Sequence, residues 1–411
     1  MLKKLKNGLF INLHFVKSFC MTSLSQFITD SRARVLLDPI KLDQPVSINE
    51  LPTPALTIDL DVFDANLLKM KHYLSENGIG LRCHTKMHKC PIIAKKQLEH
   101  GALGVCCATV SEAEIMLLGG VNNILITSPV VTNDKLKRVI ALAAQSSEIA
   151  IVLDHIENAS LLNTMAQEEN RVLSVYIDLD PGMGRTGVAP GEDALQLGLH
   201  IVNDCAHLNF MGLQMYAGNC MHIVGHEKRQ KKYQSILQKG LDTRLLFEAN
   251  DIAVPVFTGG GTGTYDMESD IGLMTELQAG SYVFMDVEYR DVGSKTNVHF
   301  LDFEASLFVL VTAISQPQST LITVDAGIKS LATDIAYPEF RDVEGVIYHF
   351  GGDEHGIIQL NNPSRTISLG DRLSVITPHC DPTVNLYDYY FPYRDGIVEE
   401  IWPISARGKS Q

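Results

Sequence analysis

The chain has 411 residues, of which 45% are apolar, so it can bury a large core, and this length usually corresponds to two domains. The formal net charge of -14, together with the absence of a long basic stripe in the sequence, argues against a nucleic-acid-binding surface. No apolar run is long enough to span a bilayer, so we expect no membrane partner.

The eight cysteines lie mostly inside apolar runs, without a CxxC pair or a disulfide-rich spacing. Reduced thiols and a cytoplasmic location are therefore the simplest expectation. Residues 1–29 contain four lysines but no acid, a bias typical of an organellar targeting segment. We expect residues 1–30 to be an N-terminal extension, with a disordered segment favoured over a targeting one.

Between residues 53 and 290, short β-like runs alternate with helical ones. Eight strands, each separated from the next by a helix, are what a closed (β/α)8 barrel requires. An open doubly wound sheet is the alternative, but the number and even spacing of the strands favour the barrel. The strands are predicted at residues 81–86, 104–109, 124–128, 149–153, 173–179, 210–216, 254–260 and 276–284.

After residue 290 the pattern changes to β-branched runs broken by Gly, Pro, Asn and Asp, with few helical stretches. This predicts a second, mostly antiparallel β-domain over residues 291–405. Residues 31–52 are expected to add a strand to that domain and to lead into the barrel. The sequence thus predicts an α/β barrel followed by a β-domain.

The segment GIGLRCHTKMHKCP is the first candidate for chemistry. Strand alternation places Arg82, His84 and Lys86 on one face, at the C-terminal end of a predicted strand. Three basic groups there suit an anionic ligand, and a lysine whose pKa is depressed by burial or a cationic neighbour can form a Schiff base. A solvated basic turn explains this segment equally well when it is taken alone.

A glycine-rich run, FTGGGTGTYD at residues 257–266, follows the seventh predicted strand. Backbone N–H groups left accessible by glycine, together with threonine hydroxyls, suit a phosphate. Barrels often bind phosphate in the loops after strands seven and eight, which favours this interpretation over a purely structural turn. The run is neither a P-loop nor a GxGxxG helix opening, so nucleotide binding is not indicated.

Two more loops at predicted strand ends carry candidate residues. DLDPGMGRTGV presents Arg185 in a tight glycine turn, either to polarise a cofactor ring or to brace the loop by pairing with Asp178 or Asp180. QMYAGNCMH offers Tyr216 and His222. His222 is a candidate acid or base, although a lone histidine is more often structural.

The stretch ITPHCDPTVNLYD is the most diagnostic part of the second domain. At strand spacing, His379 and Asp381 project together while Cys380 points away. An imidazole and a carboxylate can hold a divalent ion, and the hard oxygen favours Mn²⁺ or Mg²⁺ over Zn²⁺. Two ligands make a weak site that water and substrate oxygens would complete; a hydrogen bond within a turn is the alternative.

Taken together, these segments resemble the alanine-racemase-like (fold type III) pyridoxal-phosphate enzymes, and within them the branch of D-threonine aldolases and D-serine dehydratases. The resemblance covers nearly all of residues 50–405 and keeps the order of the motifs. Cys83 departs from the RPH that the family usually has, on the outward face of its strand. The motifs that carry the resemblance are LRCHTKMHKCP, GALGVCCATVSEAE, GMGRTGV, TGGGTGTYD, TELQAGSYVFMD, VDAGIKS, GDEHG and PHCDPTVNLYD.

The resemblance implies pyridoxal 5'-phosphate as cofactor, with Lys86 as its covalent attachment and Arg185 in contact with its ring. It also implies a head-to-tail homodimer in which each active site borrows from the β-domain of its partner. Further residues are implied to line the cofactor ring and phosphate: His84, Tyr216, Thr258, Gly259, Gly260, Gly261, Thr262, Gly263, Gly280, Ser281 and Tyr282.

The metal segment separates the branches of this family. D-serine dehydratases carry histidine and cysteine two residues apart, whereas here Asp381 lies two residues from His379, as in the aldolases. The resemblance therefore implies metal-dependent retro-aldol cleavage of D-threonine or related D-β-hydroxy amino acids to glycine and an aldehyde. Lys86 would be catalytic, and either His222 or a metal-bound water would take the hydroxyl proton.

Three other functions remain as alternatives. A D-serine or D-threo-3-hydroxyaspartate dehydratase on the same scaffold would release ammonia and a keto acid. A racemase is less favoured, because His379 and Asp381 would have no role in it. A non-catalytic cofactor-binding protein would not need the long second domain.

Overall fold

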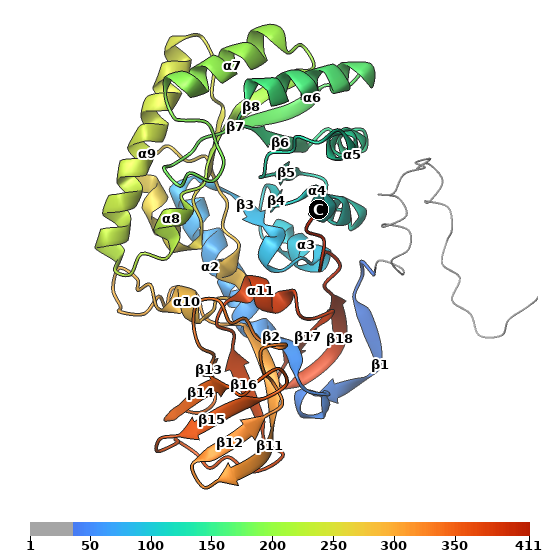
Figure 1. Ribbon diagram of the computed structural model, residues 1–411, viewed down its shortest axis with the longest axis vertical. Coiled ribbons are helices and arrows are strands. Elements are labelled where there is room, and N and C mark those ends of the chain that lie inside the picture. Colours follow the sequence, from blue (N-terminus) through green and yellow to red (C-terminus); the bar gives the residue numbers. More distant parts are fainter. Residues whose placement is uncertain (1–35) are drawn as a thin grey trace, which may run out of the picture. The chain divides into compact units, whose positions relative to one another are not determined.

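The computed structural model describes residues 36–411, except for the side chains of Ser269 and Asp270. The predicted N-terminal extension over residues 1–30 lies outside the described residues. Residues 36–411 form a closed barrel of eight parallel strands and a second sheet of ten strands, which takes its strands from both before and after the barrel in the sequence (Figure 1). The predicted fold class, a (β/α)8 barrel with a mostly antiparallel β-domain, is confirmed.

All eight predicted barrel strands are present and pair in parallel with their neighbours. They are β3 (Gly80–His84), β4 (Gly104–Cys107), β5 (Ile124–Ile126), β6 (Ile149–Leu153), β7 (Leu173–Asp178), β8 (Leu208–Met215), β9 (Val256–Gly259) and β10 (Glu276–Leu277). The α-helices that follow them in chain order are α3 (Pro91–Glu99), α4 (Val110–Leu118), α5 (Asn133–Ala143), α6 (Ile156–Glu168), α7 (Glu192–Asp204), α8 (Gly218–Met221) and α9 (His226–Ala249).

Three details of the barrel differ from the prediction. The first strand ends at His84, because the His84 side chain caps a 3-10 turn, η2 (Thr85–Met87), instead of continuing the strand. A 3-10 helix, η3 (Thr262–Asp270), rather than an α-helix, separates β9 from β10. The eighth strand is only two residues long, since the chain turns at Gly280 into another 3-10 helix, η4 (Ser281–Val283).

Helix α2 (Leu60–Asn77) precedes the barrel. Its apolar spacing and its end caps explain why these residues form a helix. Phe63, Leu67, Met70 and Leu74 share one face of this helix at the helical period, and all four are buried. Asp59 caps the first turn by accepting from two backbone N–H groups, and Gly78 ends the helix in the left-handed conformation at φ 65°.

The sheet of the second domain is mostly antiparallel, with β17 and β2 as its parallel pair. β2 lies within the range predicted for the barrel but pairs with β11 and β17, so it belongs to the sheet. β1, from the stretch before the barrel, pairs with β18. The ten strands are β1 (Ile40–Ser47), β2 (Ala55–Asp59), β11 (Leu307–Gln318), β12 (Leu321–Val324), β13 (Glu339–Phe340), β14 (Val346–Phe350), β15 (Gly356–Leu360), β16 (Arg372–Ile376), β17 (Tyr389–Arg394) and β18 (Ile397–Pro403).

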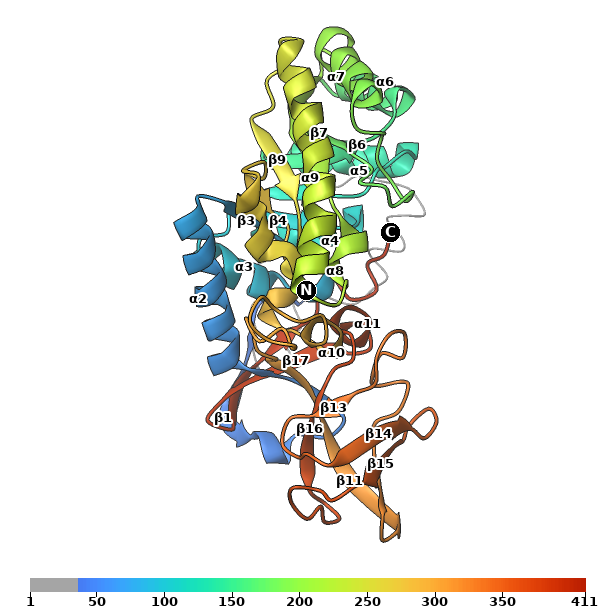
Figure 2. The same ribbon diagram turned by 90° about the vertical axis from the view of Figure 1, so that its left-hand side faces the viewer.

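Two short helices join the barrel to the sheet. α10 (Val287–Arg290) and α11 (Cys380–Val384) lie between them in both views (Figure 1, Figure 2). The Asp286 side chain links the two helices: one oxygen accepts from the N–H of Tyr289 in α10, the other from the N–H of Cys380 in α11. This junction brings residues of the second domain to the mouth of the barrel.

Three further expectations from the sequence can be checked against the described residues 36–411: reduced cysteines, an outward-facing Cys83 and the lack of a membrane span. The seven cysteines in this range are buried and free of disulfide bonds. Cys83 packs in the large core cluster and away from the small cluster of Cys106, Leu125 and Tyr176 inside the barrel, as expected for an outward-facing residue. None of the helices in the range combines the length and the apolar character that crossing a membrane requires.

Candidate active site

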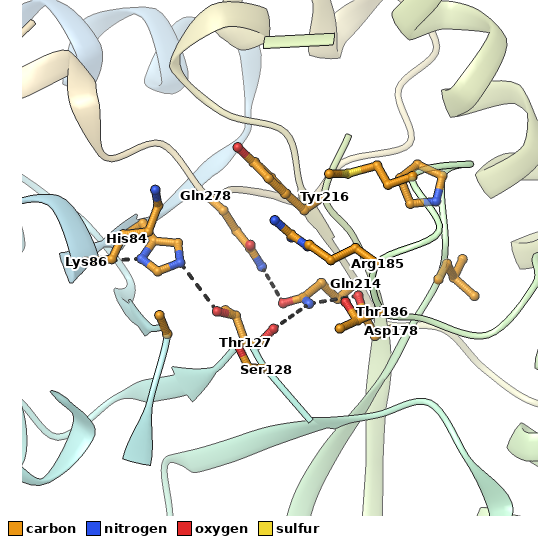
Figure 3. A pocket seen from close by; sticks show the side chains of 14 residues that line it. His84, Lys86, Thr127, Ser128, Asp178, Arg185, Thr186, Gln214, Tyr216 and Gln278 are labelled. Atoms are coloured by element: carbon orange, nitrogen blue, oxygen red, sulfur yellow. Dashed lines mark hydrogen bonds between the residues drawn. The ribbon is translucent and has the colours of Figure 1, made fainter. Parts of the chain in front are cut away.

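A cavity of about 330 Å³ opens at the C-terminal ends of the barrel strands (Figure 3). This is the end of a (β/α)8 barrel at which active sites are built. Four of the predicted cofactor residues line it: His84, Lys86, Arg185 and Tyr216. They come from the end of β3 and from the segments that follow β3, β7 and β8, which are far apart in the sequence.

Lys86 lies in the turn just beyond β3. The Nδ1 atom of His84 accepts a hydrogen bond from the backbone N–H of Lys86 at 3.3 Å, which fixes this turn. Burial and the nearby Lys86 ammonium lower the pKa of His84 to about 3, so the ring is neutral and its Nε2 atom can pair with Thr127 Oγ1 at 3.4 Å. Lys86 is thus presented from a fixed backbone.

Arg82 does not join His84 and Lys86 at the barrel mouth, contrary to the sequence prediction. Its guanidinium group forms a bidentate pair with Glu276 inside the barrel, at 2.7 and 2.9 Å, and both side chains are only 7% exposed. Because Glu276 balances its charge within the barrel, Arg82 contributes to the barrel interior and is not available to a ligand at the mouth.

The Lys86 ammonium contacts Asp381 of the second domain, with Nζ 2.6 Å from Oδ1. Removal from water disfavours the charged amine, but the Asp381 carboxylate outweighs this and raises the pKa of Lys86. The condition named for easy Schiff-base formation, a lowered Lys86 pKa, is therefore not met in this arrangement. Burial acts against the Asp381 carboxylate as well, yet Lys86 still holds the pKa of Asp381 below its usual value.

Arg185 stacks on Tyr216, with the guanidinium carbon 5.4 Å from the ring centroid. The two aspartates considered as bracing partners are engaged elsewhere. Asp178 accepts from Thr186 Oγ1 at 2.9 Å, and Asp180 accepts from backbone N–H groups of its own glycine turn. The geometry favours a role for Arg185 in the cavity over a bracing role.

Polar residues on the floor of the cavity were not predicted from the sequence. Gln278 donates to Gln214 at 3.0 Å, and Gln214 donates to Asp178 at 2.9 Å (Figure 3). Burial raises the pKa of Asp178 to about 6, although Gln214 donates to its carboxylate. A positional signal was available for Asp178 and Gln214, which lie near the ends of the predicted strands 173–179 and 210–216. Gln278 lies early in the predicted strand 276–284, which in the structure ends at Leu277.

The glycine-rich segment packs closely against the backbone that follows β8. A Cβ atom at Gly259 would lie 2.1 Å from the carbonyl oxygen of Met215, and one at Gly263 would lie 2.3 Å from that of Met221. Only glycine fits at these two positions. Thr262 Oγ1 accepts from the N–H of Tyr282 at 3.1 Å, so the two segments predicted to bind phosphate are adjacent.

Not all of the predicted cofactor residues point their side chains toward the cavity. The Tyr282 ring is buried, and its hydroxyl accepts from Gln97 at 3.2 Å, so only its backbone can face a phosphate. Thr258 is fully buried, and its hydroxyl accepts from Gln278. Gly280 lies against the backbone of the Lys86 turn, where a Cβ atom would be 2.8 Å from the His84 carbonyl oxygen.

His379 and Asp381 come together, although they do not lie in a strand as predicted. His379 is the N-cap of α11, and Asp381 lies in the first turn of that helix. The distance between His379 Nε2 and Asp381 Oδ2 is 3.8 Å. Cys380 is fully buried, with its sulfur 3.3 Å from the Met285 carbonyl oxygen, and so points away from both.

The surroundings of His379 suit a metal ligand. Its Nδ1 atom lies 2.7 Å from Asp334 Oδ2, which leaves Nε2 as the nitrogen on the side of Asp381. A carboxylate that fixes the remote nitrogen is the usual support of a ligating histidine. Over residues 36–411, no three His, Cys, Asp or Glu side chains gather closely enough to hold an ion by themselves. The pair therefore fits a site that is completed by other oxygens.

His222 lies just beyond α8, next to the His379 and Asp381 pair. Its Nδ1 atom is 3.0 Å from Glu288 Oε1, and its ring centroid is 4.7 Å from that of Tyr289. Burial, with smaller effects of His379 and Lys86, lowers the pKa of His222 to about 4. Glu288 was not predicted from the sequence, because no spacing links α10 to the other site residues.

Comparison with known proteins covers both domains. Residues 58–287 match the model of the alanine racemase N-terminal domain, and residues 306–393 match a model described as a serine dehydratase domain. A D-threonine aldolase from Arthrobacter sp. is 36% identical, over 92% of this chain and 98% of that protein. A 3-hydroxy-D-aspartate aldolase from Paracoccus denitrificans is 34% identical, over 88% of this chain and 93% of that protein.

A solved structure is similar to this chain over both domains as well. The crystal structure of D-threonine aldolase from Filomicrobium marinum matches with a TM-score of 0.86 and 33% identity, over 90% of this chain and 100% of that one. These relatives are aldolases, which are lyases, and their similarity extends through both domains. The chain is therefore a lyase that belongs to the alanine-racemase-like (fold type III) family, in the branch of D-threonine aldolases and D-serine dehydratases.

Proposed function

We propose that this chain catalyses the retro-aldol cleavage of D-threonine and related D-β-hydroxy amino acids to glycine and an aldehyde, with pyridoxal 5'-phosphate and a divalent ion. One observation carries the proposal: Lys86 at the barrel mouth and Asp381 of the second domain meet, with 2.6 Å between Nζ and Oδ1. An amine that lines the cavity, in contact with a carboxylate that could hold an ion, suits a reaction that needs both a covalently held cofactor and a cation. The aldolase relatives support the same reaction class.

The residues present fit the cofactor. The Lys86 amine would hold it covalently, Arg185 and Tyr216 would contact its ring, and the segments 258–263 and 280–282 would hold its phosphate. Gly259 and Gly263 let this segment pack directly against the backbone of Met215 and Met221, which fixes the course of the loop. When bound, the cofactor supplies an electron sink for the cleavage of the carbon–carbon bond.

His379 and Asp381 would hold the divalent ion. Asp334 orients the His379 ring, while the burial of Cys380 leaves an oxygen rather than a thiolate at the second position. An oxygen-rich set favours Mn²⁺ or Mg²⁺ over Zn²⁺. A bound cation supplies Lewis acidity, which lowers the pKa of a hydroxyl nearby.

His222 is proposed to take the proton of the substrate hydroxyl. Its pKa of about 4 means that the imidazole is neutral near pH 7 and able to accept a proton. The hydrogen-bond distance to Glu288 restrains the ring through Nδ1. Lys86, which would hold the cofactor covalently, lies beside Asp381, with 2.6 Å between Nζ and Oδ1.

A head-to-tail homodimer is proposed as the active assembly. Ile335 and Tyr337 follow Asp334 in the chain and are 54% and 65% exposed. Large apolar side chains beside a catalytic cleft are better explained by a covering partner than by contact with water. A second copy of the chain would bury them and complete the cavity.

A dehydratase acting on D-serine or D-threo-3-hydroxyaspartate is the second candidate. The match of residues 306–393 to the serine dehydratase domain model favours it. The oxygen ligand Asp381 argues for the aldolase, because the dehydratase branch has cysteine two residues after the histidine. The reaction products decide between the two.

The test uses purified protein with pyridoxal 5'-phosphate, Mn²⁺ and D-threonine. We expect glycine and acetaldehyde in equal amounts, loss of activity with EDTA, and no turnover of L-threonine. Ammonia and a keto acid in place of these products would establish the dehydratase instead.

The attachment site has its own test. Borohydride reduction of the holoenzyme should fix the cofactor on Lys86, which trypsin then releases in the peptide spanning residues 83–89. The Lys86→Ala variant should give no labelled peptide. A label on another lysine would contradict the assignment of Lys86.

A further inference from the structure

We propose that Arg229, near the start of α9, is a positioning residue that holds the proposed phosphate-binding segment and the loop of His222 in one fixed arrangement. The inference rests on the proposed function, because it explains how the cofactor and the proposed base are kept in register. None of the motifs singled out in the sequence includes this arginine.

The Arg229 side chain is fully buried. Over the described residues, its guanidinium group donates four hydrogen bonds, and each goes to a main-chain carbonyl oxygen. Nε donates to Gly263 and Nη2 donates to Gly293, both at 2.7 Å. Nη1 donates to Ile223 at 2.8 Å and to Val292 at 3.0 Å. One side chain thus fixes the main chain of three separate segments.

Two of these segments carry residues of the proposed site. Gly263 ends the glycine-rich segment that is proposed to hold the cofactor phosphate. Ile223 directly follows His222, the proposed base. The third segment, the loop after α10, is tied to the second as well, because the Val292 carbonyl oxygen also accepts from the N–H of Gly225 at 2.9 Å. A shift of any one segment is therefore passed to the others.

The chemistry of the guanidinium group suits this role. Its planar fork carries five N–H groups in fixed directions, whereas a lysine ammonium donates from a single nitrogen. Burying a charge is unfavourable unless hydrogen bonds compensate, and here the four carbonyl oxygens supply the compensation. An apolar side chain would fill the same volume without that cost, so packing alone does not explain an arginine at this position.

Two other side chains of α9 hold η3, the 3-10 helix that continues from the glycine-rich segment. His226 Nε2 lies 2.8 Å from Asp266 Oδ2, and the Tyr233 hydroxyl donates to Glu268 at 2.5 Å. Arg229 adds the contacts to the loops after α8 and α10. The N-terminal end of α9 lies close to both of these helices in the two views (Figure 1, Figure 2).

The test compares Arg229→Lys and Arg229→Gln with the wild type, each as the full chain loaded with pyridoxal 5'-phosphate. Lys keeps the charge and Gln keeps two N–H donors, but neither has a fork that reaches all three segments. Bound cofactor, followed by its absorbance during dialysis, should be lost at least about 10-fold faster from both variants. Turnover of D-threonine with Mn²⁺ should show kcat lowered by about 10-fold to 100-fold and KM changed by less than about threefold. Wild-type cofactor retention and kcat in either variant would overturn the inference.

Thr243→Val is the matched control for a general loss of stability. Thr243 is also buried on α9, about four turns further along the helix, and its hydroxyl accepts from the N–H of Gly191 at 2.9 Å. We expect a lower urea midpoint for this variant, with cofactor retention and kcat as in the wild type. A control that loses cofactor as fast as the arginine variants would make Arg229 a general stabiliser of the fold and so contradict the positioning role.

A second measurement needs no variant. Loading the wild-type chain with cofactor should slow amide hydrogen exchange in residues 258–266 and also in residues 291–294, a loop that is not proposed to touch the cofactor. Protection that stops short of residues 291–294 would refute the coupling through Arg229. A wild-type protein that shows this coupling but releases no glycine and acetaldehyde from D-threonine would refute the proposed reaction and leave the role of Arg229 in place.

Discussion

Asp381 is the residue at which the two halves of the proposed chemistry meet. Its carboxylate pairs with the Lys86 ammonium through Oδ1, while Oδ2 faces His379 Nε2 at 3.8 Å. Both neighbours stabilise the ionised form and together overcome its burial. In the proposed function, Asp381 would hold a divalent ion, with its charge now balanced by the Lys86 ammonium.

The Asp381→Asn variant tests this dual role. The amide keeps the volume but lacks the charge that holds an ion, so metal-dependent turnover should fall by at least about 100-fold. Lys86 is retained, and the absorbance of the bound cofactor should persist. Acetaldehyde release and the cofactor spectrum, each with and without Mn²⁺, measure the two effects; turnover that still responds to Mn²⁺ as in the wild type would rule out Asp381 as a ligand.

At the scale of elements, the 3-10 helix η3 supports the glycine-rich segment through a buried acid. Glu268 is fully buried, and its Oε1 accepts from the Tyr233 hydroxyl at 2.5 Å. A Cβ atom at Gly260, where φ is +62°, would collide with this same oxygen. Burial raises the pKa of Glu268 from 4.5 to about 8, so the carboxyl is neutral near pH 7 and adds no negative charge behind the proposed phosphate site.

This acid should make stability depend on pH. Between the ordinary pKa of 4.5 and the folded-state value of about 8, the folded protein keeps a proton that the unfolded chain has lost, so the free energy of unfolding falls as pH rises. From about pH 6 to about pH 8 the wild type should lose about 2 kcal/mol relative to Glu268→Gln. Urea unfolding at the two pH values measures this; parallel changes in both proteins would show that Glu268 does not titrate as described.

The junction of the first and last barrel strands depends on another buried pair, Arg82 and Glu276. Removing one partner leaves a charge without compensation, so Glu276→Ala should lower the free energy of unfolding by about 3–5 kcal/mol. The double variant Arg82→Met, Glu276→Leu removes both charges and should lose less than the single variant. Urea unfolding compares them, and an equal or greater loss in the double variant would contradict the ionic explanation.

At the scale of the whole molecule, the site exists because the sheet domain supplies residues to the barrel mouth. In the proposed head-to-tail homodimer, a second copy of the chain would cover the exposed Ile335 and Tyr337 beside Asp334. We expect sedimentation to give twice the chain mass of 45.3 kDa. On dilution, with cofactor and Mn²⁺ held constant, specific activity should fall with the dimer fraction; a fully active monomer would disprove the shared site.

The sequence by itself determined the barrel and the β-rich second domain, and it predicted four residues that line one cavity, namely His84, Lys86, Arg185 and Tyr216. This was possible because strand periodicity, glycine patterns and the motifs around Lys86, Arg185 and His379 each involve residues close together in the sequence. Such patterns can be recognised without knowing how distant segments pack. Strand ends were less predictable, since a single side-chain cap such as that of His84 turned the chain out of the strand.

Only the tertiary structure decided which charged groups meet. It moved Arg82 from the barrel mouth to Glu276, and it placed Asp381 beside Lys86, 295 residues earlier in the chain. It also revealed Glu288, whose helix carries no motif of its own. Charge pairing acts across a few ångströms and depends on burial, so the partners and the direction of the Lys86 pKa shift follow from packing between domains rather than from spacing along the chain.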